Sequence, residues 1–217
     1  MPAFAQGVHS GVLAPLDRAN VDTDAIFPKQ YGRSTAAHGF GEILFDSWRY
    51  LDPGDLGHDH SLRRPNPDFI LNRPGPRATV LLARSNFGCG SSREHAVWAL
   101  RDYGIKAVVA PSFGDIFRQN CPLNGLAAIT LGEAEVANLF DMAQAQTQAL
   151  AVTIDVLAGR LLCSGATFSF SLTARERSLL TQDIDWIGAT LAQGDAIAGF
   201  EAERLTRQPW LARMLEP

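Results

Sequence analysis

The chain has 217 residues, 46% of them hydrophobic, and a formal net charge of −4. This composition excludes a disordered chain, and the interspersed acids and bases exclude a basic nucleic-acid-binding face. No apolar run approaches the roughly 18 residues of a membrane span, and the N-terminus lacks the pattern of a signal peptide, so we expect a cytoplasmic protein.

Residues 8–16 predict a strand with a turn at Ser10-Gly11. An acidic turn at residues 20–24 follows and leads into an apolar run that Pro28 stops. The Asp-x-Asp spacing in this turn can bind calcium, but the glycine and closing glutamate of an EF-hand loop are absent. Aspartates in such turns commonly accept hydrogen bonds from nearby backbone N–H groups. We therefore favour a turn capped by its own Asx side chains.

Residues 52–77 contain five of the twelve prolines and predict a long loop, with a short strand at 68–71. The fragment Gly57-His58-Asp59-His60 resembles part of a metal site, but no further ligands lie at suitable spacing. A solvated turn is the favoured interpretation, and the roles of His38, His58 and His60 stay open.

From residue 78 the pattern becomes regular. A strand at 78–85, a helix from about 92 to 103 that ends at Gly104, and a strand at 105–110 predict a right-handed βαβ unit. The sequence then predicts a helix capped by Ser112 and running to about 120, a strand at 126–130 and a helix containing 136–143. A hairpin of 151–156 with 161–163 follows. The last predicted element is a C-terminal helix with Ile197, Phe200 and Leu205 facing inward.

Between the first strand and helix of this unit lies the turn Gly88-Cys89-Gly90-Ser91-Ser92-Arg93. Ser91 and Glu94 have the spacing of a capping box, and a helix N-terminus attracts anions. Arg93 adds donors suited to a carboxylate. Ligands of open α/β sheets bind beyond the carboxyl ends of strands, where this turn falls. The local chemistry fits both a site for a small acid and an ordinary turn with a surface arginine.

Three widely spaced cysteines without Cys-x-x-Cys spacing predict neither a disulfide framework nor an iron–sulfur cluster held by this chain alone. His95 lies about one turn into the predicted helix, so a structural role is favoured over that of a catalytic base.

The sequence resembles the small subunits of bacterial 3-isopropylmalate dehydratase, which form the separate swivelling domain of the aconitase superfamily. The Gly-x-Gly-Ser-Ser-Arg-Glu-His element of residues 88–95 is specific to that superfamily. Similar segments cover nearly the whole chain: 16–30, 39–41, 48–51, 66–69, 86–95, 110–113, 115–117, 120–121 and 200–205. The resemblance implies an α/β fold, the aconitase-like swivelling β/β/α domain, as a single domain over residues 1–217 whose βαβ core carries the turn.

The resemblance also implies a division of labour. A large subunit, the expected partner, holds a [4Fe–4S] cluster on three cysteines, and this chain contributes no metal ligand. Cys89 is therefore expected to pack within its turn. Together the subunits interconvert 2-isopropylmalate and 3-isopropylmalate through an unsaturated diacid in leucine biosynthesis. By motif, Ser91 corresponds to the proton-abstracting serine and Arg93 to the arginine that binds substrate and stabilises the alkoxide. The residues expected to bind substrate are Ser92, Asp22, Thr23, Asp24 and Arg33.

Several positions depart from the usual pattern of these small subunits. Gly32 stands where leucine is usual, the segment 32–38 replaces a basic, more apolar one, and Val97 stands where proline is common. An isopropyl group favours an apolar lining, whereas Arg33 suits an additional carboxylate. A small subunit of a related hydro-lyase that acts on another 2-hydroxy diacid, of citramalate, homocitrate or methylcitrate type, is therefore the alternative. A non-catalytic binding module is disfavoured, because Ser91, Ser92 and Arg93 are all present.

Overall fold

A computed structural model describes residues 4, 6–34, 36, 38–146, 149–182 and 186–214. The chain divides into two compact units, Met1–Asp183 and Ile184–Pro217. The sequence showed no linker between them. The single-domain prediction for residues 1–217 stays a prediction, because compactness alone does not establish which part folds independently.

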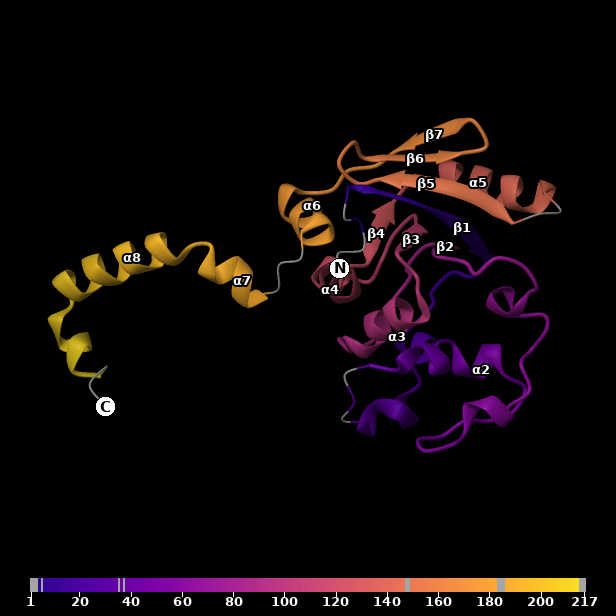
Figure 1. Ribbon diagram of the computed structural model, residues 1–217, viewed down its shortest axis with the longest axis horizontal. Coiled ribbons are helices and arrows are strands. Elements are labelled where there is room, and N and C mark those ends of the chain that lie inside the picture. The colour runs from indigo at the N-terminus through magenta and orange to yellow at the C-terminus, as the bar shows by residue number, and fades with distance from the viewer. Residues whose placement is uncertain are drawn as a thin grey trace. The chain divides into compact units, whose positions relative to one another are not determined.

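The first unit is built on one mixed β-sheet, whose strands are drawn as arrows in Figure 1. Its strand order is β4-β3-β2-β1-β5-β6-β7. Strands β1 to β4 run parallel, and β5, β6 and β7 add antiparallel on the other side of β1. The strands are β1 (Val8–Leu16), β2 (Val80–Ala83), β3 (Ala107–Ala110), β4 (Ala127–Thr130), β5 (Leu150–Asp155), β6 (Arg160–Cys163) and β7 (Ala166–Ser169).

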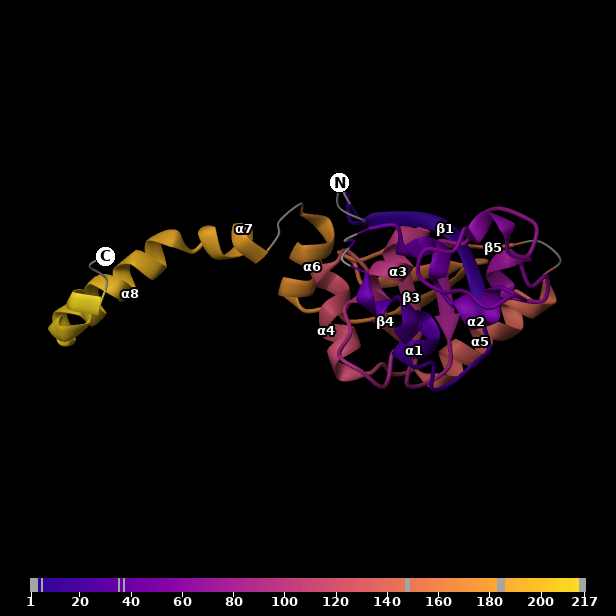
Figure 2. The same ribbon diagram turned by 90° about the horizontal axis from the view of Figure 1, so that it is seen from below.

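Helices connect the parallel strands and cover the sheet, as can also be followed in the turned view of Figure 2. Parallel β2 and β3 joined by α3 confirm the predicted βαβ unit, and Gly104 ends α3 with a φ of +107°. The helices of this unit are α1 (Thr23–Ile26), α2 (Asp46–Arg49), α3 (His95–Tyr103), α4 (Asp115–Leu123), α5 (Glu133–Ala145) and α6 (Ala174–Thr181), with 3-10 helices at Lys29–Arg33, Phe40–Ile43, His60–Leu62 and Ile70–Asn72.

The core lies in two clusters separated by the sheet. Within β2, Leu81 and Ala83 belong to one cluster, which α3 and α4 cover, while Val80 and Leu82 belong to the other, which α5 covers. Successive strand side chains point to opposite faces, so a strand buried on both faces must be apolar at every position. This requirement explains the uninterrupted apolar runs of β2 and β3.

Three local predictions were wrong. Gly11 forms no turn and pairs with Val152 inside β1, where a Cβ would lie 1.9 Å from the Thr79 hydroxyl oxygen. Residues 68–71 form no strand, and a 3-10 helix covers Ile70–Asn72 instead. Ser112 does not cap α4, because its hydroxyl accepts the backbone N–H of Asn86 at 2.8 Å.

The second unit contains α7 (Trp186–Leu191), α8 (Gly194–Arg207) and a 3-10 helix at Pro209–Met214. The predicted C-terminal helix is confirmed, but the inward-facing stripe was wrong for two of its members. The Ile197 side chain is 39% exposed and that of Phe200 is 62% exposed, since this short unit has little surface of its own to cover them. None of the helices in the described part of the chain combines the length and apolar character of a membrane span.

Candidate active site

The loops that follow β1, β2 and β3 form parallel bridges with one another beyond the carboxyl ends of these strands. The Gly88 N–H donates to the Val21 carbonyl at 2.7 Å, and Asp22 forms a parallel bridge with Cys89. Phe87 bridges Phe113 in the same sense. The loops after adjacent strands are therefore layered, which places the predicted turn at the edge where open α/β sheets bind ligands.

The loop after β1 turns into the short helix α1. The Asp22 carboxylate accepts the backbone N–H of Ala25 at 2.6 Å and caps the first turn. This contact confirms the prediction of an Asx-capped turn. It also fixes the direction in which the next two residues project.

The loop after β2 depends on glycine. Gly88 has a φ of +74°, and a Cβ there would lie 2.2 Å from Cγ of Phe117. Gly90 has a φ of +98°, a backbone conformation that side chains other than glycine disfavour. These two positions allow the chain to reverse directly beneath Ser91.

The two loops meet through four residues that we call the Ser91 cluster: Thr23, Asp24, Ser91 and Arg93. The hydroxyl oxygens of Thr23 and Ser91 lie 2.8 Å apart, and the Ser91 N–H donates to Thr23 Oγ1 at 3.1 Å. Nε of Arg93 donates to Ser91 Oγ at 2.8 Å, and one terminal nitrogen of Arg93 pairs with Asp24. The Thr23 side chain is buried, whereas Ser91 and Arg93 are partly exposed. A partly exposed serine whose oxygen accepts from a guanidinium is an arrangement suited to proton transfer.

The predicted capping box was wrong. Helix α3 begins at His95, not near Ser92, and Glu94 stands at its N-cap without a side-chain cap. Ser91 Oγ is occupied by Thr23 and Arg93, while the Glu94 carboxylate accepts the side-chain amide of Asn124 at 2.8 Å. Ser91 therefore does not cap α3, and its oxygen is not engaged by the helix.

Ser92 and Arg33 are exposed, and no hydrogen bond or ion pair involves either side chain among the described residues. Arg33 ends the 3-10 helix Lys29–Arg33, and no described contact joins it to the Ser91 cluster. Beside it, Gly32 has an ordinary φ and open space where a Cβ would stand. Thr35 and Ala37 of the divergent segment lie outside the described residues.

His95 packs among aromatic rings, as its structural interpretation predicts. Its ring centroid lies 5.0 Å from that of Phe27, 5.7 Å from Phe40 and 4.6 Å from Trp98. Of the other histidines, His38 Nδ1 lies 3.3 Å from a terminal nitrogen of Arg101, and both residues are outside the Ser91 cluster.

The histidine fragment behaves as a turn. His58 is exposed and its backbone N–H donates to the Asp55 carbonyl, while the Asp59 carboxylate accepts from Ser61. The His60 side chain lies outside the described part of the chain. In the described part, no three His, Cys, Asp or Glu side chains are placed to hold a metal ion together.

Sequence reasoning missed a buried polar cluster of Tyr31, Asp46 and Arg63. Arg63 pairs with both oxygens of Asp46, and the Tyr31 hydroxyl donates to Asp46 at 3.1 Å. Burial, reinforced by the Asp46 carboxylate, raises the pKa of Tyr31 well above its usual value. The cluster ties the predicted loop of residues 52–77 to the 3-10 helix that carries Arg33. Its only sequence signal was an aspartate inside an apolar stretch.

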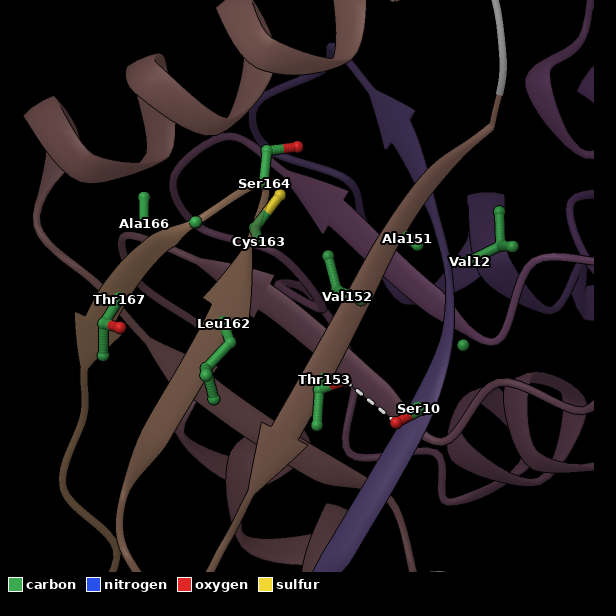
Figure 3. Close-up of a pocket in the computed structure, with 12 residues that line it drawn as sticks. Ser10, Val12, Ala151, Val152, Thr153, Leu162, Cys163, Ser164, Ala166 and Thr167 are labelled. Atoms are coloured by element: carbon green, nitrogen blue, oxygen red, sulfur yellow. Dashed lines mark hydrogen bonds between the residues drawn. The ribbon is translucent and has the colours of Figure 1, made fainter.

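A hollow of about 540 Å³ lies elsewhere, on the open face of β1, β5, β6 and β7. Figure 3 shows its small side chains and the 2.9 Å hydrogen bond between the Ser10 and Thr153 hydroxyls. None of the predicted site residues lines it. The candidate site is therefore the loop cluster at the end of the parallel strands.

Comparison with known proteins agrees with this fold. The family model described as the aconitase C-terminal domain matches residues 1–134, which include every member of the Ser91 cluster. A second model, described as the C-terminal domain of the 3-isopropylmalate dehydratase small subunit, matches residues 187–213. Fold and site together define an aconitase-type domain.

Two similar proteins indicate which family of aconitase-type proteins the chain belongs to. The 3-isopropylmalate dehydratase small subunit of Methylibium petroleiphilum is 53% identical over 210 residues, covering 96% of this chain and 97% of that protein. A crystal structure of 3-isopropylmalate dehydratase from Methanocaldococcus jannaschii has a TM-score of 0.60 at 25% identity, covering 89% of this chain and 99% of that one. The chain belongs to the family of 3-isopropylmalate dehydratase small subunits, which are parts of aconitase-type hydro-lyases that act with a large subunit.

Proposed function

We propose that this chain is the catalytic small subunit of a 3-isopropylmalate dehydratase, which interconverts 2-isopropylmalate and 3-isopropylmalate in leucine biosynthesis, in the cytoplasm. The observation that carries the proposal is the contact of Ser91 with both Thr23 and Arg93 at the end of the parallel strands. The 53% identity to a curated small subunit over nearly the full chain supports the substrate.

Ser91 is the proposed base. As an alkoxide, it takes the proton from the carbon next to a substrate carboxylate; the C–H electron pair becomes the new double bond and the hydroxyl on the neighbouring carbon leaves. An alkoxide is costly to form, and Arg93 lowers that cost because its Nε lies 2.8 Å from Ser91 Oγ. Re-addition of water in the opposite orientation completes the isomerisation.

Arg93 is the proposed carboxylate anchor. Nε and one terminal N–H are used by Ser91 and Asp24, and a guanidinium has five N–H donors, so others remain for a substrate carboxylate. The partial exposure of Arg93 leaves it accessible to a small acid.

The residues expected to bind substrate fall into two groups, those that are exposed without a partner and those that contact other residues of this chain. Ser92 and Arg33 are exposed and have no partner within the described chain, which suits direct contact with a ligand. Asp22, Thr23 and Asp24 contact this chain's own atoms, respectively the start of α1, Ser91 and Arg93. We propose that Thr23 and Asp24 act by positioning Ser91 and Arg93, and that Asp22 acts through the start of α1.

The large subunit is the proposed partner and the proposed holder of the [4Fe–4S] cluster. The donor set of this chain does not fit such a cluster, because Cys121 and Cys163 are buried in core clusters on opposite faces of the sheet. When bound in the partner, the cluster supplies a Lewis acid for the leaving hydroxyl.

A second substrate class is favoured by one observation. Arg33 is exposed and unpaired among the described residues, next to a Gly32 that leaves open space where the family usually places leucine. Such a position suits a diacid with a further carboxylate better than an isopropyl group. This alternative retains the chemistry of Ser91 and Arg93.

The test is turnover of 3-isopropylmalate by this chain together with its cluster-loaded large subunit. We expect rapid formation of the unsaturated diacid, lost when either subunit is omitted. An intact complex that dehydrates citramalate, homocitrate or methylcitrate but not isopropylmalate would instead establish the alternative.

A further inference from the structure

Thr23 is the one buried side chain of the Ser91 cluster. It is 2% exposed, and its backbone N–H donates to the Cys89 carbonyl at 2.9 Å. Its hydroxyl makes both of its described contacts with Ser91: Oγ1 accepts the Ser91 N–H at 3.1 Å and lies 2.8 Å from Ser91 Oγ. A buried hydroxyl used in this way is held by one partner alone.

Either oxygen can be the donor in the contact between the two hydroxyls. Ser91 Oγ faces two Arg93 groups that can only donate, Nε at 2.8 Å and the backbone N–H at 3.4 Å. The hydroxyl hydrogen of neutral Ser91 can point to Thr23 Oγ1 or to solvent, because Ser91 is partly exposed. Once Ser91 has lost that proton, its oxygen can only accept, and the buried Thr23 hydroxyl is placed to donate to it.

A threonine hydroxyl suits both states of Ser91, because it can donate and accept, whereas arginine can only donate. We propose that Thr23 is a positioning residue for Ser91 and that its hydroxyl is the third donor to the serine alkoxide, beside the two Arg93 groups. The Ser91 N–H stays on Thr23 Oγ1 in both states, which keeps the two oxygens at hydrogen-bond distance.

This inference rests on the proposed function, since it requires Ser91 to act as the base. It assigns Thr23 a role different from the substrate contact that the family resemblance implies. It also explains why Thr23 is buried at the start of α1, whereas the neighbouring Asp22 and Asp24 are exposed.

Two substitutions of Thr23 distinguish the effect of its hydroxyl from the effect of its side-chain shape. Thr23→Val keeps both branches at Cβ and removes the donor, and Thr23→Ser keeps the hydroxyl and removes the methyl group. Thr23→Ala, which also lacks the hydroxyl and adds no bulk, replaces the valine variant if that variant fails to fold or to bind the large subunit.

The experiment measures kcat and KM against pH for the reconstituted two-subunit enzyme. We expect Thr23→Val to lower kcat roughly 10- to 100-fold, the usual effect of losing one hydrogen bond to a charged group, with KM within about twofold. The acid limb of the kcat profile should move to higher pH, because an alkoxide with one donor fewer has a higher pKa. Thr23→Ser should stay within a few-fold of wild type.

The inference is overturned if Thr23→Val keeps the wild-type kcat and pH profile, or if the valine and serine variants lose activity equally with an unshifted profile, as a purely structural role predicts. Ser91→Ala measured in parallel separates the two proposals. If that variant retains turnover, the proposed function of Ser91 fails; if it is inactive while Thr23→Val behaves as wild type, only the role of Thr23 fails.

Discussion

Arg93 is held from two sides, and both contacts need the shape of a guanidinium. Its Nε reaches Ser91 Oγ while a terminal nitrogen pairs with Asp24. A lysine ammonium has its three donors on one atom and cannot span both partners in this way. The chemistry of the site therefore depends on arginine at this position and not on positive charge alone.

We predict that Arg93→Lys lowers kcat/KM by on the order of 10² or more, since the variant loses the donor to Ser91 and a forked carboxylate anchor. Arg84→Lys is the matched control. Arg84 is of similar exposure and also pairs with an aspartate, Asp17, at 2.5 Å, away from the cluster. Steady-state kinetics of both variants with the large subunit test this, and equal losses would contradict the assignment of Arg93.

At the scale of elements, the turn between β2 and α3 requires glycine where Gly88 stands. An alanine there would adopt a φ of +74° and place its Cβ against the Phe117 ring. We predict that Gly88→Ala lowers the free energy of unfolding by about 2–3 kcal/mol, through backbone strain and overpacking.

The control is Gly32→Ala, at a position with open space and an ordinary φ, where we expect a change within about 0.5 kcal/mol. Urea unfolding of the isolated chain measures both. Equal stability of Gly88→Ala and wild type would mean that the turn does not have the geometry described.

The cluster of Tyr31, Asp46 and Arg63 gives a second test at this scale. The Asp46 and Arg63 side chains are 2% and 6% exposed. Asp46→Asn leaves the Arg63 charge buried without its carboxylate, and removing one partner of such a pair costs about 3–5 kcal/mol. We expect a loss of that size in urea unfolding at pH 7.

Asp52→Asn is its control, because Asp52 pairs with Arg64 at the surface. The hydrogen bonds from Arg64 lower the pKa of Asp52 from its usual value near 3.8 to about 2. A lowered carboxyl pKa stabilises the fold above the unfolded-state pKa, and this contribution is lost as pH falls from about 4 towards 2. At pH 7 the control should lose far less stability than Asp46→Asn; an equal loss would refute the structural role of the buried pair.

The βαβ unit and the place of the site could be predicted because their signals are local. Doubly buried strands are apolar throughout, Gly104 ends α3, and the loops after adjacent parallel strands must lie at one edge. The start of α3 could not be predicted. Ser91 has the spacing of a cap, but its oxygen contacts Thr23, 68 residues earlier, and no local pattern records that contact.

The Arg63–Asp46 pair was missed for the same reason. Proline-rich composition predicts a loop correctly at residues 52–77, but it does not show that one of two adjacent arginines, Arg63, turns inward while Arg64 stays at the surface. Burial of a charged side chain depends on a partner that only the fold supplies.

At the scale of the whole molecule, both core clusters are formed by residues of the first unit, from Phe4 to Leu180. We predict that a chain ending at Gln182 still folds, with a cooperative thermal transition and a Tm within a few degrees of the full chain, because it retains that core. Circular dichroism of the two chains tests this. A broad, non-cooperative transition would show that residues 183–217 belong to the folding unit.

The central claim is that Ser91 is the base of a two-subunit dehydratase, and one measurement tests it most directly: kcat for dehydration of 3-isopropylmalate by the large subunit with either the wild-type chain or Ser91→Ala. The account predicts that the variant binds the large subunit normally and loses turnover by about 10⁴-fold or more. Turnover by Ser91→Ala within a few-fold of wild type would contradict it.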